Sequence, residues 1–162
     1  MASILNDLVA SGLVDRTPAG SASVFALNRY HLAAGAVEEL AFLRARLWDR
    51  IAQHAAGWAR PPEAIVVYGS AARGDGDTAS DVDLLVVRPS NVGDDDADWH
   101  RNATDLASRV TRWTGNPCEI LDRSAAQLRS MAAAGERLLG EIRRDGRAAV
   151  GSPTLVPAPE AA

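Results

Sequence analysis

Two apolar runs joined by a short polar loop constrain this chain more than any other segment. Residues 64–68 (Ala-Ile-Val-Val-Tyr) have the length, β-branching and continuous hydrophobicity of a strand that is buried on both faces. Gly69 follows directly, and glycine allows the backbone to turn sharply at the end of such a strand. Asp81-Val82-Asp83 opens the second run, where alternating side chains direct both carboxylates to one face and the valine into the core.

Paired carboxylates at this point predict a bound cation. Two carboxylates a few ångströms apart repel each other, so both stay ionised at low cost only with a cation between them. Such oxygen ligands suit Mg²⁺, which proteins usually hold with one or two carboxylates and the substrate's phosphates. A third candidate is Glu119, an acid inside the short apolar run 117–121, where it is costly unless it faces a site. Each feature alone has a plainer alternative: a solvated strand end, a common Gly-Ser turn, and an acid facing water on an edge strand.

Gly69-Ser70, followed after ten residues by Asp81-Val82-Asp83, resembles the pattern of the DNA polymerase β-like nucleotidyltransferase superfamily, especially its minimal members and kanamycin nucleotidyltransferase. Ser80 and the Ala-Arg-Gly at residues 72–74 are also similar to the minimal branch. The resemblance implies an enzyme of the α/β (α+β) class, with a small mixed sheet flanked by helices. It also implies site residues: Asp81, Asp83 and Glu119 as catalytic residues and metal ligands, and Gly69, Ser70, Arg73 and Ser80 as nucleotide-binding residues. For Arg73, an exposed salt bridge is an equally open alternative.

The reaction that the resemblance implies is two-metal nucleotidyl transfer, with Mg²⁺ or Mn²⁺ as the metal and ATP or another nucleoside triphosphate as substrate. An acceptor hydroxyl attacks the α-phosphate and pyrophosphate leaves. Members of the family modify antibiotics, RNA ends and proteins, and the minimal branch includes antitoxins that adenylylate a HEPN-type toxin, so acceptor and base stay open. The alternative of another class is a non-catalytic regulator or interaction protein. An intact carboxylate set argues against it, because idle acids would only repel one another.

The N-terminal segment predicts a short helix over residues 3–14, followed by a hairpin. The two hairpin strands, 13–14 and 23–27, enclose the turn-rich segment 17–21. A helix followed by such a hairpin resembles the end of a winged helix of the kind fused to nucleotidyltransferases in prokaryotic regulators. Nearby acids offset the arginines here, which argues against DNA binding and leaves a structural or oligomerising arm, including a homo-oligomer, as the alternative.

A helical period over residues 32–56 predicts one connecting helix, and Arg60-Pro61-Pro62 marks a boundary after it. Beyond the boundary we predict short helices over 70–73, 125–133 and 136–144, with Asp122–Ser124 as a turn and cap. The acid run 94–98 is interpreted as the cap and solvated start of a helix, not as a metal cage. The predicted parts are therefore 1–31 (partial winged helix), 32–59 (connecting helix), 60–150 (nucleotidyltransferase domain) and 151–162 (disordered tail).

Composition sets the outer limits. The 162 residues allow one ordinary domain or a small domain with an appendage, and 47% hydrophobic residues suffice for a packed core. A net charge of −4 gives no overall basic field for nucleic acid. Cys118 is the sole cysteine, which excludes an internal disulfide and a cysteine zinc site. No apolar stretch approaches membrane-spanning length, so we expect a cytoplasmic protein with no membrane partner.

Overall fold

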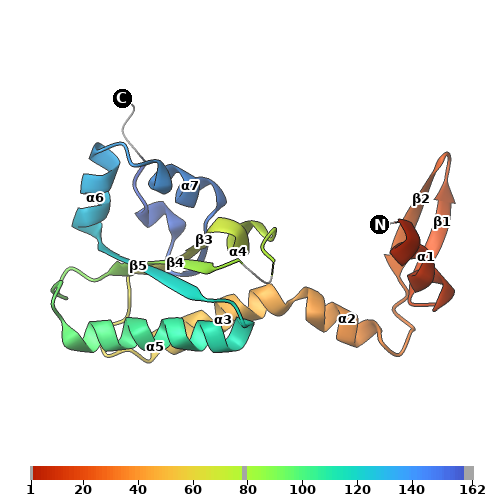
Figure 1. Cartoon of the computed structure of the whole chain (residues 1–162), viewed down its shortest axis with the longest axis horizontal. Helices are drawn as coiled ribbons and strands as arrows, with labels where there is room; N and C mark the ends of the chain where they lie inside the picture. Colours follow the sequence, from red (N-terminus) through yellow and green to blue (C-terminus); the bar gives the residue numbers. More distant parts are fainter. Residues whose placement is uncertain (1, 78–79, 159–162) are drawn as a thin grey trace. The chain divides into compact units, whose positions relative to one another are not determined.

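The computed structural model describes residues 2–77 and 80–158. The chain divides into two compact units, Met1–Ala45 and Arg46–Ala162, and each unit is described by itself. The predicted α/β class with a small mixed sheet is confirmed in the second unit, which carries all the candidate site residues (Figure 1). None of the helices among the described residues is long and apolar enough to cross a membrane.

The first unit contains a helix, a two-stranded hairpin and a second helix. Its elements are α1 (Ala2–Ala10), β1 (Val14–Ala19), β2 (Ala22–Leu27) and α2 (Ala34–Ala41). The predicted hairpin is present, but the predicted loop 17–21 is too long, since β1 and β2 remain paired up to Ala19 and Ala22. Pro18 is accommodated because a two-stranded hairpin leaves one side of each strand without ladder partners.

The predicted connecting helix is interrupted. Helix α2 ends at Ala41 and α3 spans Leu43–Ala56, so Phe42 separates them. The backbone N–H of Phe42 donates to the carbonyls of both Glu38 and Glu39, which tightens the last turn of α2. Apolar residues keep a helical spacing across the break, which explains why the sequence pattern does not detect it.

The sheet of the second unit has four strands in the order β5-β4-β3-β6. Its strands are β3 (Ala64–Tyr68), β4 (Val82–Arg88), β5 (Cys118–Ser124) and β6 (Arg147–Val150). Strand β3 pairs antiparallel with β4 and with β6, whereas β4 and β5 are parallel. The mixed sheet therefore has β4 in an interior position, with β5 as one edge.

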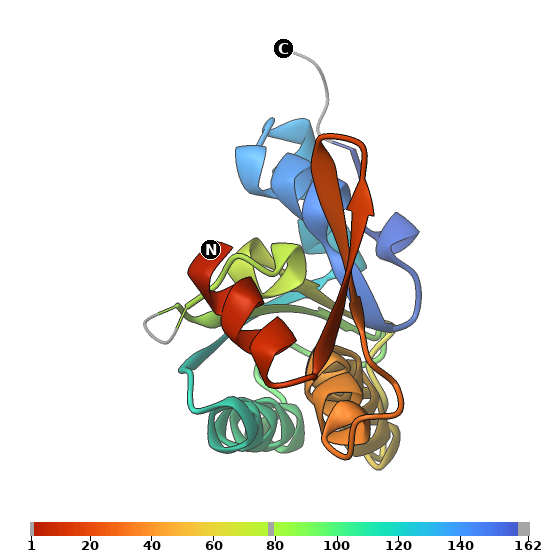
Figure 2. The same cartoon turned by 90° about the vertical axis from the view of Figure 1, so that its right-hand side faces the viewer.

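Helices cover both faces of this sheet, and the two faces form separate apolar cores (Figures 1 and 2). On one face, Ile65 and Val67 of β3 belong to a cluster with α3 and α5 (Ala97–Thr114). On the other, Ala64 and Val66 belong to a cluster with α6 (Ala125–Ala133) and α7 (Arg137–Asp145). The prediction that residues 64–68 form a strand buried on both faces is thus confirmed for Ala64–Val67.

Helix starts in this unit follow the predicted capping residues. Asp96 caps α5 by accepting a hydrogen bond from the Trp99 backbone N–H, as expected for the acid run. Ser124 and Gln127 form a capping box at the start of α6. The predicted turn over Asp122–Ser124 is wrong for its first two residues, since β5 continues through Ser124 in register with β4.

The chain after α7 returns to the sheet. Strand β6 was not expected, because Arg-Ala-Ala-Val carries no clear strand pattern. Beyond it, Pro153–Leu155 form a 3₁₀ turn and Val156 is fully buried against the core formed with α6 and α7. This differs from the predicted disordered tail 151–162, of which residues 159–162 lie outside the described residues.

Glycine 151 provides a test of how tightly β6 closes on β3. It has a φ of +67°, and a Cβ there would overlap the Glu63 carbonyl oxygen. We expect Gly151→Ala to lower the free energy of unfolding by about 2 kcal/mol more than Gly115→Ala. Gly115 is the matched control because its φ is +81° but no atom lies within 4 Å of the added Cβ. Equal losses in urea denaturation would show that no close approach exists.

Candidate functional site

A row of polar side chains crosses three strands of the sheet. Tyr68 of β3 is the register partner of Asp83 of β4, and Asp83 is the register partner of Glu119 of β5. Directly opposed residues project from the same face of a sheet, so these three side chains share one face. It is the face that carries α6 and α7, because Tyr68 packs against the cluster that contains them. The structure therefore brings Asp83 and Glu119 together, in a half-buried and an exposed position respectively.

Gly69 lies directly beside the Asp83 carboxylate. Its φ is +67°, in the left-handed region, and a Cβ on it would overlap Asp83 Oδ2. Helix α4 (Gly69–Arg73) begins at this residue, so the helix predicted over residues 70–73 is present and starts one residue earlier. Glycine is therefore needed twice over: for the turn from β3 into α4, and for the close approach of Asp83.

The electrostatics of the row reflect crowded negative charge. Burial, the Glu119 carboxylate and the Asp81 carboxylate all raise the pKa of Asp83 above its ordinary value. Burial together with Asp83 and Glu119 raises the pKa of Tyr68 to about 12, so its phenol stays protonated at neutral pH. The same three causes raise the pKa of the Cys118 thiol to about 12, which makes this cysteine a poor nucleophile.

Asp81 is exposed and lies immediately before β4, which begins one residue later than the sequence pattern suggests. Val82 and Leu84 are buried in the core beneath α3 and α5, as predicted from the alternation. In residues 2–77 and 80–158, no group of three or more His, Cys, Asp or Glu side chains is arranged to hold a metal ion. The candidate carboxylates are thus close enough to repel one another without forming a ready-made cage.

The two serines predicted to bind nucleotide both lie close to Gly76. A Cβ on Gly76 would lie 3.1 Å from Ser70 Oγ and 3.4 Å from Ser80 Cβ. Ser80 Oγ donates to Asp77 Oδ1 at 2.9 Å and accepts from the Asp77 backbone N–H at 3.0 Å. The loop therefore folds back so that Ser80 approaches the start of α4, although residues 78 and 79 lie outside the described part.

Arg73 is engaged by carboxylates on two sides. Its Nε donates to Asp75 Oδ2 at 3.0 Å, and its Nη1 lies 3.9 Å from Asp145 Oδ2. These contacts fit the salt-bridge interpretation of Arg73, and its phosphate role stays a prediction.

Three residues near the row were not singled out from the sequence. Tyr68 resembles the last apolar residue of a core strand, and Arg123 resembles part of a turn. The charge of Arg123 lowers the pKa of Tyr68, against the larger raising effects, so its guanidinium lies within electrostatic range of the row. Asn116, in the connection between α5 and β5, donates hydrogen bonds to the loop that carries Ser80. Its position in a polar connection gave no signal of this role.

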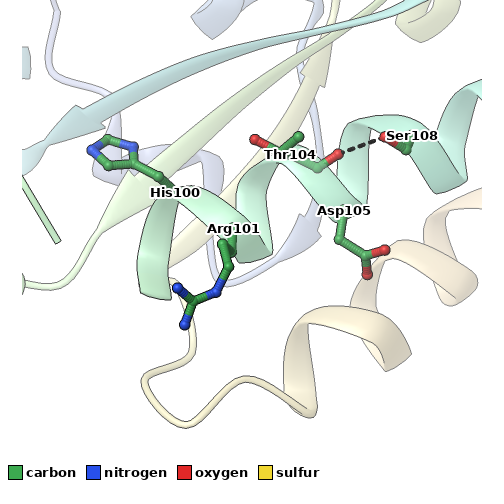
Figure 3. A pocket seen from close by; sticks show the side chains of 5 residues that line it. All are labelled: His100, Arg101, Thr104, Asp105 and Ser108. Carbon is green, nitrogen blue, oxygen red and sulfur yellow. Dashed lines mark hydrogen bonds between the residues drawn. The ribbon is translucent and has the colours of Figure 1, made fainter. Parts of the chain in front are cut away.

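A shallow pocket elsewhere in this unit carries no comparable chemistry (Figure 3). All of its lining residues belong to α5: His100, Arg101, Thr104, Asp105 and Ser108. The polar side chains of His100, Arg101, Asp105 and Ser108 have local partners; for example, Ser108 Oγ donates to the Thr104 carbonyl. Two acids of the run near this helix are likewise paired: Asp94 contacts Arg88 and Asp98 contacts Arg101. Capping by Asp96 is thus as predicted, whereas the ion pairs of Asp94 and Asp98 were not part of the predicted solvated helix start.

The family model described as "Nucleotidyltransferase domain" matches residues 47–137, more than half of the chain. The chain belongs to this nucleotidyltransferase family. The matched region contains the whole Tyr68–Asp83–Glu119 row and the Gly69-Ser70 turn, so the proposed resemblance is confirmed at the level of the family. No curated protein sequence is significantly similar to the chain.

Several solved toxin–antitoxin structures show a weak likeness to this nucleotidyltransferase. One was solved with AMP-PNP (TM-score 0.45, 18% identity, covering 65% of this chain and 73% of the other). Another is a mutant of the MntA–HpeT pair (TM-score 0.44, 15% identity, covering 65% of this chain and 73% of the other). A third is a tri-AMPylated Shewanella oneidensis HEPN toxin in complex with MNT antitoxin (TM-score 0.41, 12% identity, covering 67% of this chain and 73% of the other). Because these TM-scores are below 0.5, family membership rests on the sequence model alone.

The raised pKa of Asp83 predicts a pH-dependent gain in stability on its neutralisation. A raised pKa in the folded state means that the contribution of Asp83 is favourable at low pH and is lost as the pH rises through its folded pKa. In metal-free buffer, Asp83→Asn should therefore be more stable than the natural protein at pH 7, by up to about 1 kcal/mol given screening by water.

The stability gain of Asp83→Asn should shrink as the pH falls towards 3.8, the ordinary pKa of an aspartate. Urea denaturation across this range measures it, with Asp95→Asn as a control for net charge. A gain that does not depend on pH would contradict the electrostatic explanation.

Proposed function

We propose that this nucleotidyltransferase moves a nucleoside monophosphate, by default AMP from ATP, to a hydroxyl on an acceptor. The observation that supports it best is the carboxylate arrangement beside the Gly69-Ser70 turn: Asp83 and Glu119 are register partners, and the charge of Asp81 acts on Asp83. All three causes that shift the pKa of Asp83 raise it. A divalent cation would relieve this repulsion, and family membership supplies the matching chemistry.

The donor set fits a hard cation. It consists of carboxylate oxygens, which Mg²⁺ and Mn²⁺ prefer, and it lies partly exposed at the starts of β4 and β5, where side chains can adjust their rotamers. We assign Asp81, Asp83 and Glu119 as the ligands. When bound, the metal would neutralise charge on the phosphates and make an acceptor hydroxyl more acidic.

The chain's own residues would then bind and orient the triphosphate and deprotonate the acceptor hydroxyl. Gly69 and Ser70 would present free backbone N–H groups at the start of α4 to the triphosphate. Ser80 would have to release its hydroxyl hydrogen from Asp77 Oδ1 to donate to a phosphate. Arg73 would have to leave Asp75 to contact a phosphate. Glu119 is the exposed member of the row, so it is the carboxylate best able to take the acceptor's proton. The acceptor oxygen forms a bond to the α-phosphorus, the bond to the β-phosphate oxygen breaks, and pyrophosphate leaves.

We propose a protein hydroxyl as acceptor, such as one on a HEPN-type toxin. The support is the minimal-branch pattern of residues 69–83 and the small size of the unit that carries it. RNA ends and small molecules are the acceptors to be compared with it. The sequence pattern favours no base, so the first nucleotide to test is ATP.

Removal of two carboxylates should abolish metal-dependent nucleotide binding. In isothermal titration with a non-hydrolysable ATP analogue, we expect binding that requires Mg²⁺ in the natural protein and is lost in Asp81→Ala/Asp83→Ala. Transfer of label from α-labelled ATP should fall roughly a thousandfold or more in the same variant, because the metal stabilises the transition state by several kcal/mol.

The matched control is Asp95→Ala/Asp98→Ala, which changes net charge equally in the acid run outside the site. It should bind the analogue as the natural protein does. Unchanged binding and transfer in a folded Asp81→Ala/Asp83→Ala protein would overturn the assignment. Failure of the natural protein to bind any nucleoside triphosphate would favour the regulator alternative.

A further inference from the structure

Asn116 connects two parts of the chain that lie far apart in sequence. It is half-buried in the connection between α5 and β5. Its side-chain Nδ2 donates to the Ser80 carbonyl at 2.7 Å and to the Asp77 carbonyl at 3.0 Å. Both hydrogens of the amide group are thus used on the loop that leads into Asp81.

Asn116 is itself held by the end of α5. Its backbone N–H donates to Thr114 Oγ1 at 3.1 Å, and Thr114 Oγ1 donates to the Val110 carbonyl at 2.9 Å. Val110 is fully buried in the core beneath the sheet. The backbone of Asn116 is therefore anchored to a buried part of the domain, and its side-chain amide group reaches the loop from that position.

The same connection fixes the other side of Asp81. The backbone N–H of Val82 donates to the Pro117 carbonyl at 2.8 Å. The carbonyl before Asp81 and the N–H after it are thus both hydrogen-bonded to consecutive residues, Asn116 and Pro117. With its backbone held on both sides, Asp81 has mainly side-chain freedom left. Ser80, whose carbonyl accepts from Asn116, lies close to Gly76, as does Ser70.

We propose that Asn116 is a positioning residue for the metal–nucleotide site: its amide group holds Ser80 and Asp81 where they meet the cation and the phosphates. This inference rests on the proposed nucleotidyl transfer and adds a residue to it. Positioning of this kind matters because ligand groups that lose their outer support bind a metal 10–100-fold more weakly in general. Glu119 follows Asn116 by only three residues, so the same connection adjoins both Asp81, just before β4, and Glu119 on β5.

The experiment measures Mg²⁺-dependent binding of the ATP analogue in three variants of Asn116. Asn116→Ala removes both donors, Asn116→Asp replaces them with acceptors that face two carbonyl oxygens, and Asn116→Gln keeps an amide group on a longer stem. We expect the Ala and Asp variants to need about 10–100 times more Mg²⁺ for half-maximal binding. Asn116→Gln should recover part of the loss. The control is Thr111→Ala, which removes a side-chain hydrogen bond to the Ala107 carbonyl on α5.

The Mg²⁺ requirement separates positioning from general stability. A purely structural role would lower the melting temperature of the Ala and Asp variants and leave the Mg²⁺ requirement of the folded fraction unchanged, which would overturn the inference. If Asn116→Ala does not fold, the Mg²⁺ requirements of Asn116→Asp and Asn116→Gln are compared instead. A higher requirement in Asn116→Asp supports positioning, and an unchanged requirement in both variants overturns it. An absence of binding by the natural protein itself would contradict the proposed function first, so the two failures are distinguishable.

Discussion

The pairing of β4 with a neighbour on each side is the constraint on which the candidate site depends. Strand β4 places Asp83 opposite Tyr68 on one side and Glu119 on the other. Residues Leu84–Val87 of the same strand are fully buried and alternate between the two apolar cores. A slip of one residue would exchange the faces and bury Asp83 against α3 and α5. The hydrophobic pattern of β4 therefore fixes the position of the acid as firmly as it fixes the core.

Features set by local chemistry were accessible from the sequence. The strand 64–68 follows from continuous β-branched residues, and the start of α6 follows from Ser124 as a cap. Strand β6 was not accessible, because its place depends on close approaches between distant segments: a Cβ on Gly146 would lie 2.8 Å from Val66 Cγ1. Propensity says little about a four-residue strand that is held by contacts of this kind.

In the candidate site too, some residues carry a local sequence signal and others are placed only by contacts between distant segments. Asp83 and Glu119 were identifiable because an acid inside an apolar run requires an explanation, and their pairing in the sheet agrees with a common role. Tyr68 gave no such signal, since an aromatic residue that ends a buried strand is ordinary. Asn116 was missed for another reason: its partners Asp77 and Ser80 lie more than thirty residues earlier in the chain, and only the fold brings them together.

Acids elsewhere in this domain differ from Asp83 in how their charge is balanced. The pKa of Asp96 is lowered by the Trp99 backbone N–H and by Arg60, and the pKa of Asp145 is lowered first by its hydrogen bond from Arg144. For Asp83, the causes are burial and two further carboxylates, all of which raise the pKa. A chain with 17 basic residues thus stabilises several acids with arginines but places Asp83 beside two further carboxylates. That arrangement costs stability in the free protein, and either protonation of Asp83 or a bound cation would relieve the cost. The unfavourable electrostatics of the row are therefore the physical basis on which its affinity for a divalent metal would rest.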